Sequence, residues 1–281
     1  MRQLATVDPE TLAPNVASIS ASPVSNPVRT NLKVRIRNAA TSVLPFAILI
    51  VLWQGFSADT GPRSVFLPSP LAVLKAFAEL LRDSSFYSDI GWSIYRVTVA
   101  FFLSAIVAIP IGILSGRFRG IALFIHPLNN FMRYLPVASL IPLCILWVGI
   151  GDLNKILVIF LGTVFQLVPL VADTSSGIPE SLIDLSRIQG ASRTQVVLKV
   201  VVPWCSPTIY DHCRIALGWA WSYLIVAELV ATTSGIGRVI IQAQRFIQTP
   251  RVIAGIIVIG LLGLSFDQIF KHCRSRIFSW T

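Results

Sequence analysis

Arg133 is the side chain whose chemistry contrasts most with its surroundings. It lies with Asn129 and Asn130 in a long apolar stretch, residues 121–150, that is interrupted by three prolines. A guanidinium group offers five donors and a permanent charge, which suits a planar or tetrahedral oxyanion. Polar groups inside a membrane segment are costly and usually functional. We therefore predict that these three residues line a path for a small anion; the alternative is that Arg133 reaches a lipid headgroup or pairs with an acid.

Two more polar residues lie in apolar surroundings. Gln166 has an amide that can donate either to an anion or to a neighbouring helix, and both interpretations stay open. Glu228 would repel an anion if it were unpaired. Pairing with an arginine is the favoured interpretation of Glu228, and a place along the substrate path is the alternative.

The cysteines and histidines match no metal or redox motif. None of the four cysteines forms a CxxC pair. The adjacent pairs His212–Cys213 and His272–Cys273 have no spacing typical of zinc sites. The sequence also shows no paired acids and no nucleophile with a nearby base. We predict no catalytic residue and no metal site, so the chain is not expected to be an enzyme.

The elements that must position these residues are membrane helices. Hydrophobic residues make up 54% of the chain and charged residues only 13%, against about 25% charged in soluble proteins. A helix needs about 20 mostly apolar residues to cross a bilayer, where backbone groups must pair internally. The predicted fold is an all-α, polytopic bundle of about six membrane helices. The six candidate stretches are Ala39–Ala58, Val97–Gly116, Ile121–Ile150, Ile156–Ala172, Ile215–Ala231 and Val252–Phe270.

Two of the predicted segments are irregular. Residues 121–150 are too long for one simple span, and their prolines predict a broken or kinked helix. The connection 59–96 is expected outside, with an amphipathic stretch over 71–81 that can lie on a surface.

The ends of the chain are expected on the cytoplasmic side. Residues 1–38 are predicted to be a disordered tail, because they contain no apolar run of the kind found in a signal peptide, and residues 39–281 form the membrane domain. The formal charge of +10 comes from basic residues scattered between the apolar blocks, so we interpret them as topology signals. Arg117 and Arg119 lie in a short loop expected inside.

The inner connection 173–214 has the pattern of two short helices. Pro179 favours a helix start, Gly190 a helix end, and Ser192 an N-cap for a second helix that is expected to stop at Pro203. A rigid helix pair of this kind can dock a cytoplasmic partner. The alternatives are an ordinary loop and a DNA-binding helix-turn-helix, which is disfavoured because membrane segments tie down both ends.

This connection resembles the EAA motif of ATP-binding-cassette importer permeases. Asp184, Gly190 and Pro203 have the spacing of the motif, with Asp184-Leu185-Ser186 in place of Glu-Ala-Ala. Other segments are similar to the branch that imports nitrate, sulfonates, taurine and bicarbonate. They are Leu67–Pro70, Ser93–Arg96, Gly112–Gly116, Leu135–Pro136, Ile141–Gly149, Gly151–Lys155 and Ala220–Leu229.

The resemblance implies a type I importer permease with a MetI-like fold in the cell inner membrane. It implies a second copy of the chain, two cytoplasmic ATPase subunits that bind ATP and magnesium, and a periplasmic or lipid-anchored binding protein. No nucleic acid is expected, and lipid surrounds the helices. This chain has no GxxxxGK[ST] motif, so the nucleotide is expected in the separate subunits. The residues implied in ATPase coupling are Asp184, Leu185, Ser186, Gly190, Ala191, Ser192 and Pro203.

A channel or an ion-driven carrier is the alternative class of transporter. Neither would need an ATPase or an inner docking element, so copurification of an ATPase separates the classes. Within the resemblance, residues 135–143 and 147–151 are closer to the sulfonate and taurine type than to the nitrate type.

Overall fold

The structure is a computed structural model that describes residues 32–57, 66–230 and 233–278, with side chains from residue 44 onward. Its contacts divide the chain into two units, residues 1–52 and residues 53–281. The first unit contains most of helix α1 (Leu32–Phe56). This helix begins inside the predicted tail, whose residues 1–31 lie outside the described part. Residues 44–56 of α1 form a short apolar helix, and Ala58, the last residue of the first predicted span, is also outside the description.

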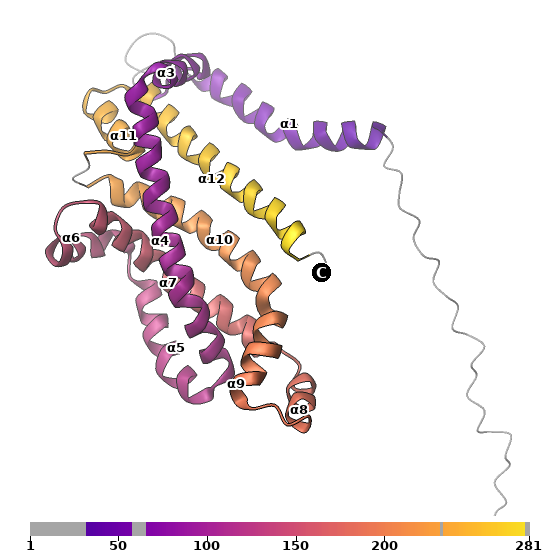
Figure 1. Ribbon diagram of the computed structural model, residues 1–281. Helices are drawn as coiled ribbons and strands as arrows, with labels where there is room; N and C mark the ends of the chain where they lie inside the picture. Colours follow the sequence, from indigo (N-terminus) through magenta and orange to yellow (C-terminus); the bar gives the residue numbers. More distant parts are fainter. Residues whose placement is uncertain (1–31, 58–65, 231–232, 279–281) are drawn as a thin grey trace, which may run out of the picture. The chain divides into compact units, whose positions relative to one another are not determined.

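The regular elements of the second unit's described residues are all helices, which confirms the predicted all-α class (Figure 1). Its longer helices are α4 (Ser84–Arg117), α7 (Asp152–Ser176), α10 (Val202–Glu228) and α12 (Thr249–Ile277). The shorter ones are α3 (Pro70–Arg82), α5 (Arg119–Tyr134), α6 (Val137–Val148), α8 (Glu180–Ile188), α9 (Arg193–Val196) and α11 (Ile236–Arg245), with a π-helical segment, η3 (Val197–Val201), before α10.

Within the described residues, α4, α7 and α12 are long and apolar enough to cross a membrane. The α5–α6 pair passes the same test only when the two helices are taken together, as a broken span or a re-entrant loop. Helix α10 is long enough but carries Asp211 and Arg214. Those two charges are paired with α12: Arg214 binds Asp267, and Arg274 lies 2.7 Å from Asp211. A charged helix can therefore pack inside the bundle.

The predicted break in residues 121–150 is confirmed. Helices α5 and α6 meet at an angle of 101° across Leu135 and Pro136. Both residues have extended backbone, with ψ of 129° and 121°. A proline disfavours helical backbone at the residue before it, so the helix ends where Pro136 requires it to end.

The predicted connection 59–96 is shorter in the structure. Helix α4 begins at Ser84, well before the predicted start at Val97, because the Asp83 carboxylate accepts a hydrogen bond from the Ser85 amide and caps the helix. The predicted amphipathic stretch is helix α3. Its N-cap is Ser69, and it buries an apolar stripe of Val73, Ala76 and Leu80.

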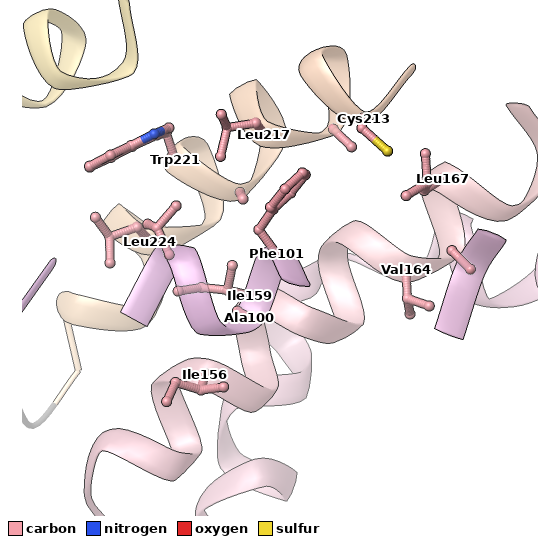
Figure 2. Packing of buried hydrophobic residues seen from close by; sticks show 14 of the residues in the cluster. Ala100, Phe101, Ile156, Ile159, Val164, Leu167, Cys213, Leu217, Trp221 and Leu224 are labelled. Atoms are coloured by element: carbon pink, nitrogen blue, oxygen red, sulfur yellow. The ribbon is translucent and has the colours of Figure 1, made fainter. Parts of the chain in front are cut away.

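The core of the second unit lies between α4, α7 and α10. Figure 2 shows apolar side chains from these three helices meeting: Ala100, Phe101, Ile156, Ile159, Val164, Leu167, Cys213, Leu217, Trp221 and Leu224. Helices α4 and α7 approach closely at Gly112. A Cβ there would lie 2.5 Å from the Cβ of Val171 and 2.9 Å from the Val168 carbonyl oxygen. Small residues allow such backbone contact between membrane helices.

The predicted helix stop at Pro203 is wrong. The chain stays helical from Arg193 through α9, η3 and α10 to Glu228. Pro203 is the second residue of α10 and follows the π-helical segment η3 almost directly. The preceding π-helical turns shift the hydrogen-bond register before the proline, so the helix continues past it.

Candidate functional site

The connection between α7 and α10 has the predicted helix–glycine–helix form. Helix α8 starts after Pro179 and ends at Ile188. Gly190 has φ of +84°, and its amide donates to the Arg187 carbonyl while the Ala191 amide donates to Ser186. This is a Schellman closure, for which glycine is preferred because left-handed backbone strains other residues.

Ser192 starts the second helix of this connection. Its hydroxyl accepts from the Gln195 amide, and the Gln195 side chain accepts in return from the Ser192 amide at 2.8 Å. Reciprocal bonds of this kind satisfy two otherwise free helix donors. The turn between α8 and α9 is thus fixed on both sides, and the connection is a rigid element.

A single bidentate ion pair holds α8 to the end of α4. The Arg117 guanidinium donates to both Glu180 oxygens, at 2.9 and 3.1 Å. Glu180 lies in the first turn of α8, so the charge also favours the helix N-terminus. Hydrogen bonding to Arg117 lowers the pKa of the Glu180 carboxyl below its ordinary value. In Figure 1, α8 and α9 lie at the end of the bundle where α4 leads into α5.

The residues implied in ATPase coupling lie mostly on the surface of this element. Ser186 and Ala191 are half-buried, and the other five are exposed: Asp184, Leu185, Gly190, Ser192 and Pro203. Ile183 is fully buried and fixes the inner side of α8. The structure therefore presents an exposed acid and an exposed leucine side by side on a short, anchored helix. Their role in coupling stays a prediction.

Arg133 lines a cavity of about 330 Å³ beside the α5–α6 break. The break turns the chain at Leu135 and Pro136, which also line the cavity. Gln166 of α7 lines the same cavity, so the structure brings two of the predicted path residues together. The Arg133 guanidinium lies 5.3 Å from the ring of Tyr134 and has no ion-pair partner within the described part of the chain.

Tyr223 of α10 also borders this cavity, and it was not selected from the sequence. A Cβ at Gly162 of α7 would lie 2.5 Å from the Tyr223 ring, so the missing side chain makes the space that the ring occupies. A cation, an amide and a phenol from three helices thus surround one space. That set can bind an anion through a charge and directed donors.

The two asparagines predicted beside Arg133 do not share its cavity. Asn129 is buried, and its amide donates to the Phe165 carbonyl of α7 at 3.0 Å. It therefore ties α5 to α7. Asn130 is exposed on α5. Asn130 and Asn129 lie three and four positions before Arg133, so helical spacing alone predicts neighbouring faces for the three residues. The separation comes from tertiary packing, because the Phe165 carbonyl of α7 takes the Asn129 amide.

Glu228 lies in a separate buried network with Arg96. The Arg96 Nη1 lies 2.5 Å from Glu228 Oε1, and both side chains are fully buried. Ser93 donates to the same carboxylate, and the Gly237 amide donates to its second oxygen at 2.8 Å. Asp152 of α7 accepts from Arg96 at 2.6 Å. The network therefore ties α4, α7, α10 and the start of α11 together.

Sequence reasoning missed Arg96, which it placed in the outer connection as a topology signal. The available signal was its position in the segment Ser93–Arg96, two of whose members contact Glu228. Helical spacing puts both on one face. Within the described residues, no group of three or more metal-ligating side chains is found.

Comparison with known proteins places these elements in a family. Residues 108–279 match the binding-protein-dependent transport system inner membrane component family. This chain belongs to that family. The match covers the inner connection, the α5–α6 break and the cavity beside Arg133.

Several relatives are transport permeases. The chain is 32% identical over 234 residues to the putative aliphatic sulfonates transport permease SsuC of Bacillus subtilis, with 83% of this chain and 85% of the relative covered. It is 28% identical to the taurine transport permease TauC of Escherichia coli, covering 87% and 90%. It is 25% identical to the nitrate import permease NrtB of Synechocystis, covering 95% and 98%.

A solved structure supports the MetI-type fold. An inward-facing MetNI methionine transporter chain matches with a TM-score of 0.55 at 21% identity, over 64% of this chain and 92% of that chain. The predicted fold class is thus confirmed, and the family describes a component of the inner membrane.

Proposed function

We propose that this chain is the membrane permease subunit of an ATP-driven importer for a small anion of the sulfonate, taurine, nitrate or bicarbonate class. The observation that carries the proposal is the α8–Gly190–α9 element, a rigid and anchored helix pair with exposed Asp184 and Leu185. Family membership and the named relatives support it.

The energy for transport comes from separate ATPase subunits. They bind ATP and magnesium and dock on the exposed residues of α8 and its turn. A second copy of the chain completes the path, and a soluble binding protein delivers the anion at the opposite end. Both termini lie in the cytoplasm, which follows from the basic residues beside the inner connection.

The anion passes the cavity that Arg133, Gln166 and Tyr223 line. Arg133 supplies the charge, because a guanidinium binds a tetrahedral or planar oxyanion through parallel donors. Gln166 and Tyr223 supply neutral donors, so the site attracts an anion without a second fixed charge that would hold it too tightly for release. Sulfonates and taurine are the preferred substrates, since the relatives named for them are 32% and 28% identical to this chain, against 25% for the nitrate import permease.

The test is uptake by the whole transporter in proteoliposomes. The permease is coexpressed with its ATPase and binding protein and offered labelled taurine, an alkanesulfonate, nitrate or bicarbonate. Arg133→Gln should abolish uptake without changing copurification of the ATPase. Arg119→Gln, which removes the same charge from the start of the same helix, should transport normally.

The outcomes separate the alternatives. Normal uptake by Arg133→Gln would remove Arg133 from the path. Uptake that proceeds without ATP, and a permease that purifies without any ATPase, would indicate a channel or an ion-driven carrier instead.

A further inference from the structure

Three arginines from three separate segments line a small cavity beside the inner connection. The cavity has a volume of about 170 Å³ and is lined by Arg117, Phe118, Arg187, Ala191, Arg193, Val196 and Val197. Arg117 ends α4, Arg187 lies in the last turn of α8, and Arg193 begins α9. We call this space the arginine niche. It shares no residue with the cavity beside Arg133.

The niche has an excess of positive charge. Arg117 is paired with Glu180, and Arg187 has one longer contact to Asp184 at 3.3 Å. Both carboxylates face solvent, with 62% and 58% of their side-chain surface exposed, so these pairs are weak. Arg193 has no ion-pair partner within the described residues. Three cations therefore face two exposed acids, and one guanidinium is free to bind an anion.

Part of the wall of the niche is apolar. Phe118, Val196 and Val197 face the same space, and Val196 is buried. A free inorganic anion would gain nothing from these apolar side chains. A ligand with a charged head and an apolar body would contact both them and the arginines.

The helix that forms this wall has the surface of a membrane-interface segment. Leu198 and Trp204 are exposed, at 61% and 43%, and Lys199 lies between them in the sequence. Tryptophan and lysine are enriched where a helix passes from lipid to water. The apolar helix α4 ends nearby at Arg117, a basic residue in its last turn, which also indicates a position where a helix passes from lipid to water. Basic pockets at this level on the cytoplasmic side bind anionic lipid headgroups.

We infer that the arginine niche binds the phosphate headgroup of an anionic phospholipid. The three arginines hold the phosphate, and the Phe118–Val197 wall contacts the glycerol and the upper acyl chains. The lipid would bridge α4 to the α8–α9 element, beside the Arg117–Glu180 pair. This inference does not depend on the transported substrate; it requires that the niche stay open to lipid when the ATPase of the proposed function docks on α8, since Arg187 and Ala191 belong to both surfaces.

The experiment is native mass spectrometry of the complete transporter released from nanodiscs of phosphatidylglycerol and phosphatidylcholine. The wild type should retain phosphatidylglycerol. Each arginine near an anionic lipid surface contributes a factor of about five in affinity, so Arg193→Gln should lower retention about fivefold and the Arg187→Gln/Arg193→Gln double variant about 25-fold. Arg119→Gln is the matched control, since it removes a nearby exposed arginine that does not line the niche, and its retention should equal that of the wild type.

Three results would overturn the inference. The first is equal phosphatidylglycerol retention by the double variant and the wild type. The second is displacement of the lipid by an equal concentration of inorganic phosphate, which would mean that the niche binds the free ion. The third is loss of the ATPase subunits from the double variant with lipid retention unchanged, which would assign the arginines to a protein contact. Failure of the uptake experiment with Arg133→Gln would leave the lipid measurement unaffected.

Discussion

The Arg96 guanidinium and the Glu228 carboxylate lie 2.5 Å apart with no exposed side-chain surface on either residue. The two are separated by 132 positions in the sequence and lie on α4 and α10. Removing water from two charges is costly unless hydrogen bonds satisfy their remaining groups. Ser93, Asp152 and the Gly237 amide provide those bonds. The pair therefore links α4 rigidly to α10 in the folded protein.

Glu228→Ala should destabilise the chain strongly. The substitution leaves Arg96 buried, with the partly exposed Asp152 as its remaining acidic partner. Breaking a buried ion pair typically costs about 3–5 kcal/mol of stability. The measurement is the midpoint of thermal unfolding of the detergent-solubilised protein, followed by size-exclusion chromatography. Glu79→Ala is the control, because its pair with Arg251 is exposed and should cost under about 1 kcal/mol. Equal midpoints for the two variants would contradict the assignment.

The close contact of α4 with α7 predicts that alanine substitutions at two glycines of α4 have different effects on stability. Gly112→Ala places a methyl group 2.5 Å from the Val171 Cβ, and overpacking of this kind costs about 1–3 kcal/mol. Gly91→Ala meets nothing within 4 Å and should be neutral or stabilising by up to about 1 kcal/mol. The same unfolding assay compares the two. A stable Gly112→Ala protein would show that the helices can separate at this contact without loss.

The features that the sequence predicts correctly are those determined by residues adjacent in the chain. The break at Pro136 follows from proline sterics, and the turn at Gly190 follows from the demand for left-handed backbone. Both were found where the sequence predicts them. The helix stop at Pro203 fails because a π-helical segment, which no local pattern in the sequence indicates, precedes the proline.

The residues of the candidate site are harder to predict from the sequence than the fold is. Gln166 and Arg133 were both selected as polar residues in apolar segments, and they share a cavity. Asn129 was selected for the same reason, but it bonds the Phe165 carbonyl of a neighbouring helix. Burial cost applies equally to a group that binds substrate and to one that joins helices. Distinguishing them requires the tertiary packing.

The backbone of Gly190 predicts a loss of coupling without loss of assembly. Gly190→Ala meets no atom within 4 Å, so its effect comes from φ of +84°, which costs a residue with a Cβ about 1–2 kcal/mol. We expect the α8–α9 turn to open and binding-protein-stimulated ATP hydrolysis to fall. Gly177→Ala is the matched control, because Gly177 has an ordinary φ of −76° at the end of α7. Wild-type stimulation in Gly190→Ala would mean that the turn geometry does not transmit the signal.

The Arg117–Glu180 pair predicts that α8 loosens in acid. Arg117 lowers the pKa of Glu180 below its ordinary value of 4.5, so the stabilisation is fully present above 4.5 and is lost as the pH falls through the lower, folded pKa. Amide hydrogen exchange in α8, corrected for the intrinsic effect of pH, should rise as the pH falls below 4.5. Glu180→Gln should raise exchange in α8 modestly at neutral pH, because the pair is exposed, and should remove the pH dependence; Arg117→Gln should do the same. Glu79→Gln serves as the control, because Glu79 belongs to a different exposed pair. Exchange in α8 that is independent of both substitutions would show that packing around Ile183, and not the ion pair, holds the helix in place.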